Sequence, residues 1–360
     1  MSNVNIKRAV ENIRANTTIY TPLVEVIVNA IQAIDEAGKT NGKVSIRTHR
    51  SSQTEMDGSL PDVLSFEIED NGIGFTEAHR DSFDTLYTDF RINEGGKGFG
   101  RFTCLKYFEN LHVNSVFRTD SIFKIRRFLM GKENNIIVDE KVETCEQQES
   151  GTVVTLSTLK KGRSFDKKLS TIARNLVERL LPYFITQDYV CPEIILSEID
   201  GSSAICLNDY FSNELSAVIR EISVEGNTFT LKSINTEEDF LVRVFKLYSP
   251  RNQKSRISLV AHKREVSGSM IHKYIPEFED EFYEKNRSGE IDHERNYIIK
   301  AYVFGSYLDC NVSLERGSFE FQMESDLTFG IAQAEIEREA AAITKESVGT
   351  DIILRQEKKK

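Results

Sequence analysis

The chain has 360 residues, and at roughly 150 residues per domain this length predicts two domains. Hydrophobic residues make up 39% of the chain and the 20 glycines add about 6%, which lies near the globular norm and excludes global disorder. The 46 basic and 56 acidic residues give a formal net charge of −10, so the whole chain does not attract nucleic acid or anionic lipid, although local basic patches stay open.

Neither a membrane segment nor a metal-ligand pattern stands out. The longest apolar runs fall far short of the roughly 18 residues that cross a bilayer, and the charged amino terminus is unlike a signal peptide, so we expect a cytoplasmic protein without membrane contact. The five cysteines are scattered and the six histidines form no pair at helical spacing. We therefore expect free thiols and no metal site built from protein side chains alone.

The first half of the chain alternates helical and strand patterns. Helices are predicted over residues 3–14, 21–37, 77–85, 100–108 and 166–183. Strands are predicted over residues 43–50 and 63–69, as a hairpin, and over residues 111–117, 122–129, 135–142 and 152–158. A polar loop over residues 89–96 separates two of the helices, and together these elements predict a first domain over residues 1–187.

The second half predicts an α+β domain over residues 188–328, with strands that include residues 256–261 and 297–302. Residues 330–347 are rich in Ala, Glu and Ile at helical spacing, and residues 355–360 are charged. Residues 329–360 are therefore predicted to form an exposed terminal helix and a charged tail.

The first chemical signal is Glu25-x-x-x-Asn29 within the second predicted helix. Residues four apart lie on one helix face, so the carboxylate and the carboxamide point at one site. Asn29 offers an oxygen for Mg²⁺, and Glu25 can polarise a water. The alternative is a solvated helix face, but the apolar neighbours of the pair predict a buried helix in which both side chains need partners.

The second signal is the sequence Asp70-Asn71-Gly72-Ile73-Gly74-Phe75, which follows a strand. A carboxylate at a strand end can accept a hydrogen bond from an exocyclic amine, while Gly72 and Gly74 allow positive φ angles and close approach by a flat ring. The pattern suits adenine, and its alternative is a simple turn.

The third signal is a glycine-rich stretch that opens the helix predicted to begin at residue 100. Its backbone N–H groups and one lysine would face phosphates at a helix amino terminus, whereas the alternative is a plain flexible loop. The stretch consists of Gly95, Gly96, Lys97, Gly98, Phe99 and Gly100. It is not a Walker A loop, because neither Ser nor Thr follows the lysine.

The order of the three motifs resembles the GHKL superfamily, which includes gyrase B, HSP90-like chaperones, histidine kinases, MutL and MORC-like proteins, and whose Bergerat fold binds ATP. The sequence Ser150-Gly151-Thr152-Val153-Val154 looks like a fourth family element, in which a threonine joins the aspartate in holding adenine through water. Many members have Asp where this chain has Gln32, a difference that touches neither the base nor the metal ligand. The resemblance covers residues 1–185.

The second domain carries shorter matches. The sequence from Asp309 to Arg316 is similar to the stretch of MutL and the heat-shock chaperones in which a transducer domain of ribosomal-protein-S5 type places a cation on the γ-phosphate, and Arg316 holds that position. The alternative for Arg316 is an ordinary surface arginine. Residues 259–266 resemble the MutL strand and turn that precede this stretch.

The resemblance implies an α+β chain: a Bergerat-fold α/β sandwich, with an antiparallel sheet and helices on one face, followed by an S5-like α+β domain. It implies Mg-dependent ATP binding, slow hydrolysis, a lid over residues 86–97 and an ATP-dependent homodimer within a larger machine. In this hypothesis adenine contacts Asp70 and Thr152, Mg²⁺ binds Asn29, and Glu25 and Arg316 are catalytic. A nucleotide-binding switch without turnover and a histidine kinase are the alternatives.

Two basic clusters leave nucleic-acid contact open as well, with solvated faces as the alternative reading. The first comprises Arg118, Lys124, Arg126, Arg127 and Lys132, and the second comprises Lys160, Lys161, Arg163, Lys167 and Lys168.

Overall fold

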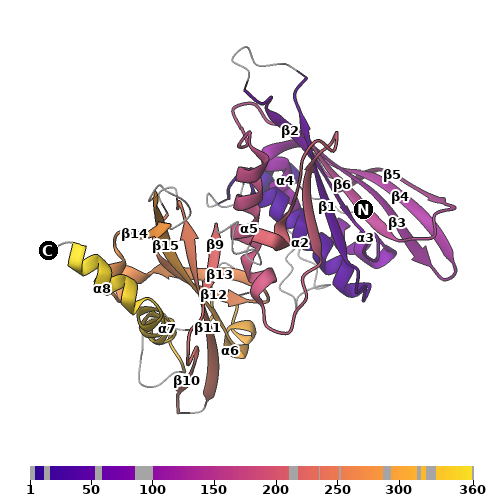
Figure 1. Cartoon of the computed structure of the whole chain (residues 1–360). Helices are drawn as coiled ribbons and strands as arrows, with labels where there is room; N and C mark the ends of the chain where they lie inside the picture. The colour runs from indigo at the N-terminus through magenta and orange to yellow at the C-terminus, as the bar shows by residue number, and fades with distance from the viewer. Residues whose placement is uncertain are drawn as a thin grey trace. The chain divides into compact units, whose positions relative to one another are not determined.

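The computed structural model describes residues 5–11, 17–52, 59–85, 100–210, 218–234, 236–250, 253–286, 293–313, 318–321 and 330–358. The chain divides into two compact units, Met1–Asn208 and Asp209–Lys360, which are coloured indigo to magenta and orange to yellow in Figure 1. Within the described ranges no helix is long and apolar enough to span a bilayer.

Eight strands in the described part of the first unit form one sheet in the order β5-β4-β3-β6-β2-β1-β7-β8. Neighbouring strands are antiparallel, except that β1 and β7 are parallel. The strands are β1 (Lys43–Arg50), β2 (Val63–Asp70), β3 (Phe108–Thr119), β4 (Ile122–Met130), β5 (Ile137–Thr144), β6 (Gly151–Leu159), β7 (Glu193–Glu198) and β8 (Ala204–Cys206). The predicted hairpin is thus confirmed, and it places the end of β2 in the middle of the sheet.

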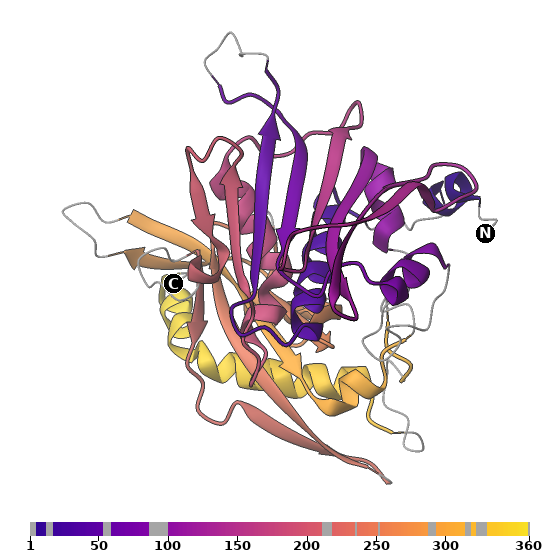
Figure 2. The ribbon, with the colours of Figure 1, turned by 90° about the vertical axis from the view of Figure 1, so that its right-hand side faces the viewer.

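Helices α2, α4 and α5 cover one face of this sheet (Figures 1 and 2). The helices of the unit are α1 (Ile6–Glu11), α2 (Thr21–Glu36), α3 (Glu77–Asp84), α4 (Gly100–Tyr107) and α5 (Leu169–Ile185). Proline near the start of α2 fits the first turn, where its missing N–H costs nothing, and Gly38 just past the end has φ +62°. Leu23, Ile27 and Ile31 are fully buried, so α2 is fixed against the sheet by its apolar side.

The second sheet runs β10-β11-β15-β12-β13, with β14 beside β15 and β9 beside β11. Its strands are β9 (Ile219–Ile222), β10 (Thr228–Lys232), β11 (Glu237–Tyr248), β12 (Arg256–Ala261), β13 (Arg264–Met270), β14 (Phe282–Asn286) and β15 (His293–Phe304). The helices of this unit are α6 (Ser306–Cys310), α7 (Gln333–Ser347) and α8 (Gly349–Lys358). Short 3₁₀ turns are η2 (Leu207–Tyr210), η3 (Ile271–Lys273) and η4 (Pro276–Phe278).

The terminal helix is not exposed, contrary to the prediction. Ile336, Ala340 and Ala341 of α7 are at most 1% exposed and belong to the hydrophobic core of the second unit. Glu337, 2% exposed, accepts hydrogen bonds from Tyr274 and from Ser269 of β13. The predicted charged tail begins within α8, where Arg355 donates to the Glu277 carbonyl at 2.6 Å. Residues 333–358 are therefore part of the second unit, as Figure 2 shows in yellow.

The first unit continues past residue 187, because β7 pairs with β1 from Lys43↔Glu193 to Thr48↔Glu198. Both units mix strands and helices, with an antiparallel-rich sheet in the first unit and a second sheet after it. This is the fold class that the sequence predicts.

Candidate functional site

Asp70 ends β2 and is only 7% exposed. Its carboxylate accepts the backbone N–H of Gly72 at 2.8 Å and the backbone N–H of Thr152. Burial raises the pKa of Asp70 from 3.8 to about 7, and the two backbone hydrogen bonds lower it less than burial raises it. A carboxyl group with such a pKa can accept a hydrogen bond when it is ionised and donate one when it is protonated.

The turn after Asp70 requires both of its glycines. Gly74 has φ +81°, and a Cβ there would collide with the carbonyl oxygen of Val116. A Cβ on Gly72 would lie 2.6 Å from the backbone carbon of Ala33 in α2, and the N–H of Ile73 donates to the Ala33 carbonyl at 3.0 Å. The turn and α2 are therefore packed backbone to backbone.

Thr152 lies opposite Asp70 in the β2·β6 pair and opposite Ser115 in the β3·β6 pair. Thr152 and Ser115 are 8% and 1% exposed, and their hydroxyl oxygens are 2.9 Å apart. Because directly paired residues project from the same face of a sheet, Asp70, Thr152 and Ser115 form one buried row across three strands. We call it the polar row. Ser115 carries no sequence signal, since it is one serine in an alternating strand.

Glu25 and Asn29 lie on the side of α2 that is not covered by the core. Asn29 is exposed and Glu25 is half-buried, so the expectation that both are buried is wrong for Asn29. A Cβ on Gly100 would collide with Oε2 of Glu25, so the carboxylate lies directly against the first residue of α4. The buried Cys104 is also close enough for Glu25 to raise its thiol pKa further, burial being the larger cause.

Part of the predicted site lies outside the described residues. This applies to Gly95, Gly96, Lys97, Gly98 and Phe99, and to Arg316 in the second unit.

The described residues on the two sides of the glycine stretch contact each other. Arg101 in α4 donates a hydrogen bond to the carbonyl of Thr85 at 2.9 Å. The Arg101 guanidinium also lies 5.1 Å from the ring centre of Phe83 in α3. These contacts hold the start of α4 beside the end of α3.

Arg126 is a structural residue of this region. It is 1% exposed, donates to the carbonyls of Phe75 and Thr76 at 2.7 and 2.9 Å, and pairs with Glu77 and Glu140. Its place in a solvent-facing basic cluster is therefore a wrong prediction. It fixes the residues that follow the Asp70 turn.

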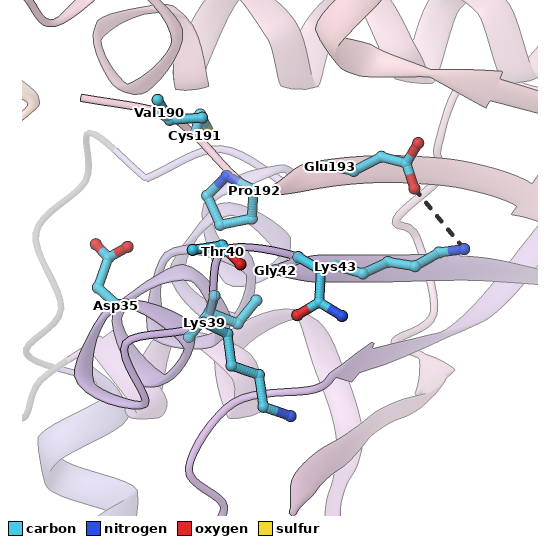
Figure 3. Close-up of a pocket in the computed structure, with 11 residues that line it drawn as sticks. Asp35, Lys39, Thr40, Gly42, Lys43, Val190, Cys191, Pro192 and Glu193 are labelled. Atoms are coloured by element: carbon cyan, nitrogen blue, oxygen red, sulfur yellow. Dashed lines mark ion pairs between the residues drawn. The ribbon is translucent and has the colours of Figure 1, made fainter. Parts of the chain in front are cut away.

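A separate open cavity of about 610 Å³ lies at the end of α2, in the first unit (Figure 3). Lys43 and Glu193 form an ion pair of 3.8 Å along its rim, and Val190, Cys191 and Pro192 face the helix end. None of the predicted site residues that the structure describes lines this cavity.

Two comparisons with known proteins find similarity to this chain. Residues 17–163 match the family model described as histidine kinase-, DNA gyrase B-, and HSP90-like ATPase. The whole chain is similar to a crystal structure of the N-terminal domain of a DNA repair protein, with a TM-score of 0.53, 13% sequence identity, and coverage of 97% of this chain and 99% of that one. No curated protein matches the chain. The match at this identity concerns the fold alone.

Proposed function

We propose that this chain, whose residues 17–163 match the histidine kinase-, DNA gyrase B-, and HSP90-like ATPase family, binds ATP with Mg²⁺ and hydrolyses it slowly. The observation that carries the proposal is the polar row beside the two-glycine turn. It supplies a buried acceptor, Asp70, beside a turn whose two glycines pack directly against the backbone of α2 and β3.

Adenine fits this site by its hydrogen-bonding pattern. Its exocyclic amine is a donor, and Asp70 is an acceptor that burial keeps from water. A bound guanine would present a carbonyl oxygen instead, which leaves a buried acceptor unpaired. The proposal therefore includes selectivity for ATP over GTP.

Asn29 is the residue of this site that suits Mg²⁺. No three histidine, cysteine, aspartate or glutamate side chains of the described ranges gather as a ligand set, whereas Mg²⁺ in nucleotide sites needs only one or two protein oxygens beside phosphates and water. The exposed carboxamide of Asn29 can supply one such oxygen. When bound, the ion would neutralise charge on the phosphate oxygens.

Glu25 is the proposed water-activating residue. It lies one helical turn before Asn29 and against Gly100, at the amino-terminal end of α4, where the helix dipole favours phosphate. The carboxylate can therefore accept a proton from a water that attacks the terminal phosphate. Lys97 and its neighbouring glycines are proposed to surround the phosphates.

The remaining parts of the proposal concern the response to ATP. Arg316 would contact the γ-phosphate, residues 86–97 would close over the nucleotide, and two chains would associate in the ATP state as part of a larger machine. Arg or Lys at the γ-phosphate is expected because charge on the transferred group is stabilised by cations.

The test compares wild type with Glu25→Ala and, as a matched acidic control on the same helix, Glu36→Ala. ATP affinity, phosphate release and molecular mass are measured in each, with Mg²⁺ and with a non-hydrolysable ATP analogue. We expect Glu25→Ala to bind ATP and lose most phosphate release, and Glu36→Ala to resemble wild type. Wild-type turnover in Glu25→Ala contradicts the catalytic assignment.

Two other outcomes identify the alternatives. Tight ATP binding by wild type without phosphate release above the blank indicates a nucleotide-binding switch. A stable phosphoprotein after incubation with γ-labelled ATP indicates a histidine kinase.

A further inference from the structure

The hydroxyl of Ser115 has three partners and one proton. Its oxygen accepts the backbone N–H of Phe75 at 2.8 Å, lies 3.0 Å from the carbonyl of Gly151 and lies 2.9 Å from the hydroxyl of Thr152. The side chain is 1% exposed, so water does not replace any of these partners. The direction of each hydrogen bond is therefore fixed by the protein.

One arrangement satisfies all three partners. A carbonyl oxygen can only accept, so the Ser115 proton goes to Gly151, and the two lone pairs of Ser115 accept from Phe75 and from the Thr152 hydroxyl. If Ser115 instead donated to Thr152, the half-buried Gly151 carbonyl would lose this donor. In the arrangement that satisfies all three partners, the Thr152 hydroxyl donates its proton to Ser115 and has none left for a ligand.

We propose that Ser115 is a positioning residue for purine recognition, because it turns the Thr152 hydroxyl into an acceptor on the side that faces the ligand. This inference rests on the proposed ATP site. When Asp70 is ionised, Asp70 and Thr152 then present two acceptors and no side-chain donor to the base edge. Such an edge favours an amine, or a water that donates in both directions, and disfavours the 6-oxo group of guanine or hypoxanthine.

The structure separates this role from simple support of the turn. Ser115 also holds the N–H of Phe75, and Arg126 holds the carbonyl of Phe75 from the other side. Loss of support for the turn should weaken the binding of every purine nucleotide to a similar extent. Loss of the fixed direction of the Thr152 hydroxyl should instead change the ratio of the affinities for different purine nucleotides.

The experiment measures dissociation constants of the full chain for ATP and for ITP, which differs from ATP by a 6-oxo group and a protonated N1. The variants are Ser115→Ala, Thr152→Val and the double variant, with Ser115→Cys as a closer volume match. We expect wild type to prefer ATP by at least about tenfold, and Ser115→Ala and Ser115→Cys to reduce this ratio by about threefold to tenfold, as for one hydrogen bond. In the Thr152→Val background, Ser115→Ala should not change the ratio further.

Each outcome is decisive. Wild type that binds neither nucleotide, or binds both equally, contradicts the proposed ATP site itself. Wild type that prefers ATP while Ser115→Ala and Ser115→Cys keep the full ratio overturns the role of Ser115 alone. An equal effect of Ser115→Ala with and without the Thr152 hydroxyl also overturns it, because the effect would then act through the turn.

Discussion

Replacing Asp70 with asparagine should change how the stability of the nucleotide-free protein depends on pH. Burial raises the pKa of Asp70 from 3.8 to about 7, so the native state disfavours the ionised carboxylate. The difference between 3.8 and about 7, at about 1.4 kcal/mol for each pH unit, corresponds to about 4 kcal/mol. The carboxamide of the Asp70→Asn variant is neutral at every pH and avoids this cost.

The sign follows from proton binding. Below about pH 4, both the folded and the unfolded chain hold the Asp70 proton, and the group has no effect on stability. Between about pH 4 and pH 7 the unfolded chain releases the proton while the folded chain keeps it, so wild type loses stability as the pH rises. Above about pH 7 both states are ionised and the full cost remains.

The assay is calorimetric unfolding of wild type and Asp70→Asn without nucleotide, at intervals from about pH 4.5 to about pH 8. The buried amide of the variant adds an offset that does not vary with pH, so the measured quantity is the change of the difference with pH. We expect the free energy of unfolding of the variant, relative to that of wild type, to rise by about 3 to 4 kcal/mol from the lowest to the highest pH of this range. A difference that stays constant with pH refutes the reasoning.

Two further changes test the packing around this site and in the second unit. Gly74→Ala should destabilise the first unit by about 2 kcal/mol or more, because φ is +81° and the new Cβ meets the Val116 carbonyl. We expect a lower midpoint of urea unfolding, and an unchanged midpoint contradicts the prediction. Ile336→Ala should lower the unfolding temperature of the second unit, at a cost of about 2 to 5 kcal/mol, because Ile336 is fully buried in α7. Wild-type thermal unfolding of this variant would mean that α7 does not pack on the core.

Local patterns predict most of the first unit. Proline at the start and glycine at the end fix α2 to within one residue, and alternation predicts the pairing of β1 with β2. The position of β7 could not be predicted in this way, because its partner β1 lies about 150 residues earlier and no turn connects them. The sequence does not predict the burial of α7, because its inner face includes Glu337 and Thr344, whose partners lie on other elements or on the preceding turn.

In the candidate site too, local sequence predicts some features, and others depend on how the elements pack. The sequence predicts a carboxylate at the end of β2 followed by glycines that the turn needs, and the backbone conformation of Gly74 explains why. It does not predict the exposure of Asn29, which depends on where the other helices leave α2 uncovered. Ser115 and Arg126 act through partners on β6, β5, helix α3 and the loop at Phe75, so their roles depend on the register of the sheet.

The parallel pairing of β7 with β1 has a consequence for the order in which the first unit folds. Until residues 193–198 have left the ribosome, β1 is an edge strand whose outward N–H and C=O groups have no partner in the sheet. Joining strands about 150 residues apart also requires closure of a long loop, which slows folding. A nascent chain released after α5 would therefore present an open sheet edge next to the Asp70 turn, where a second nascent chain could pair.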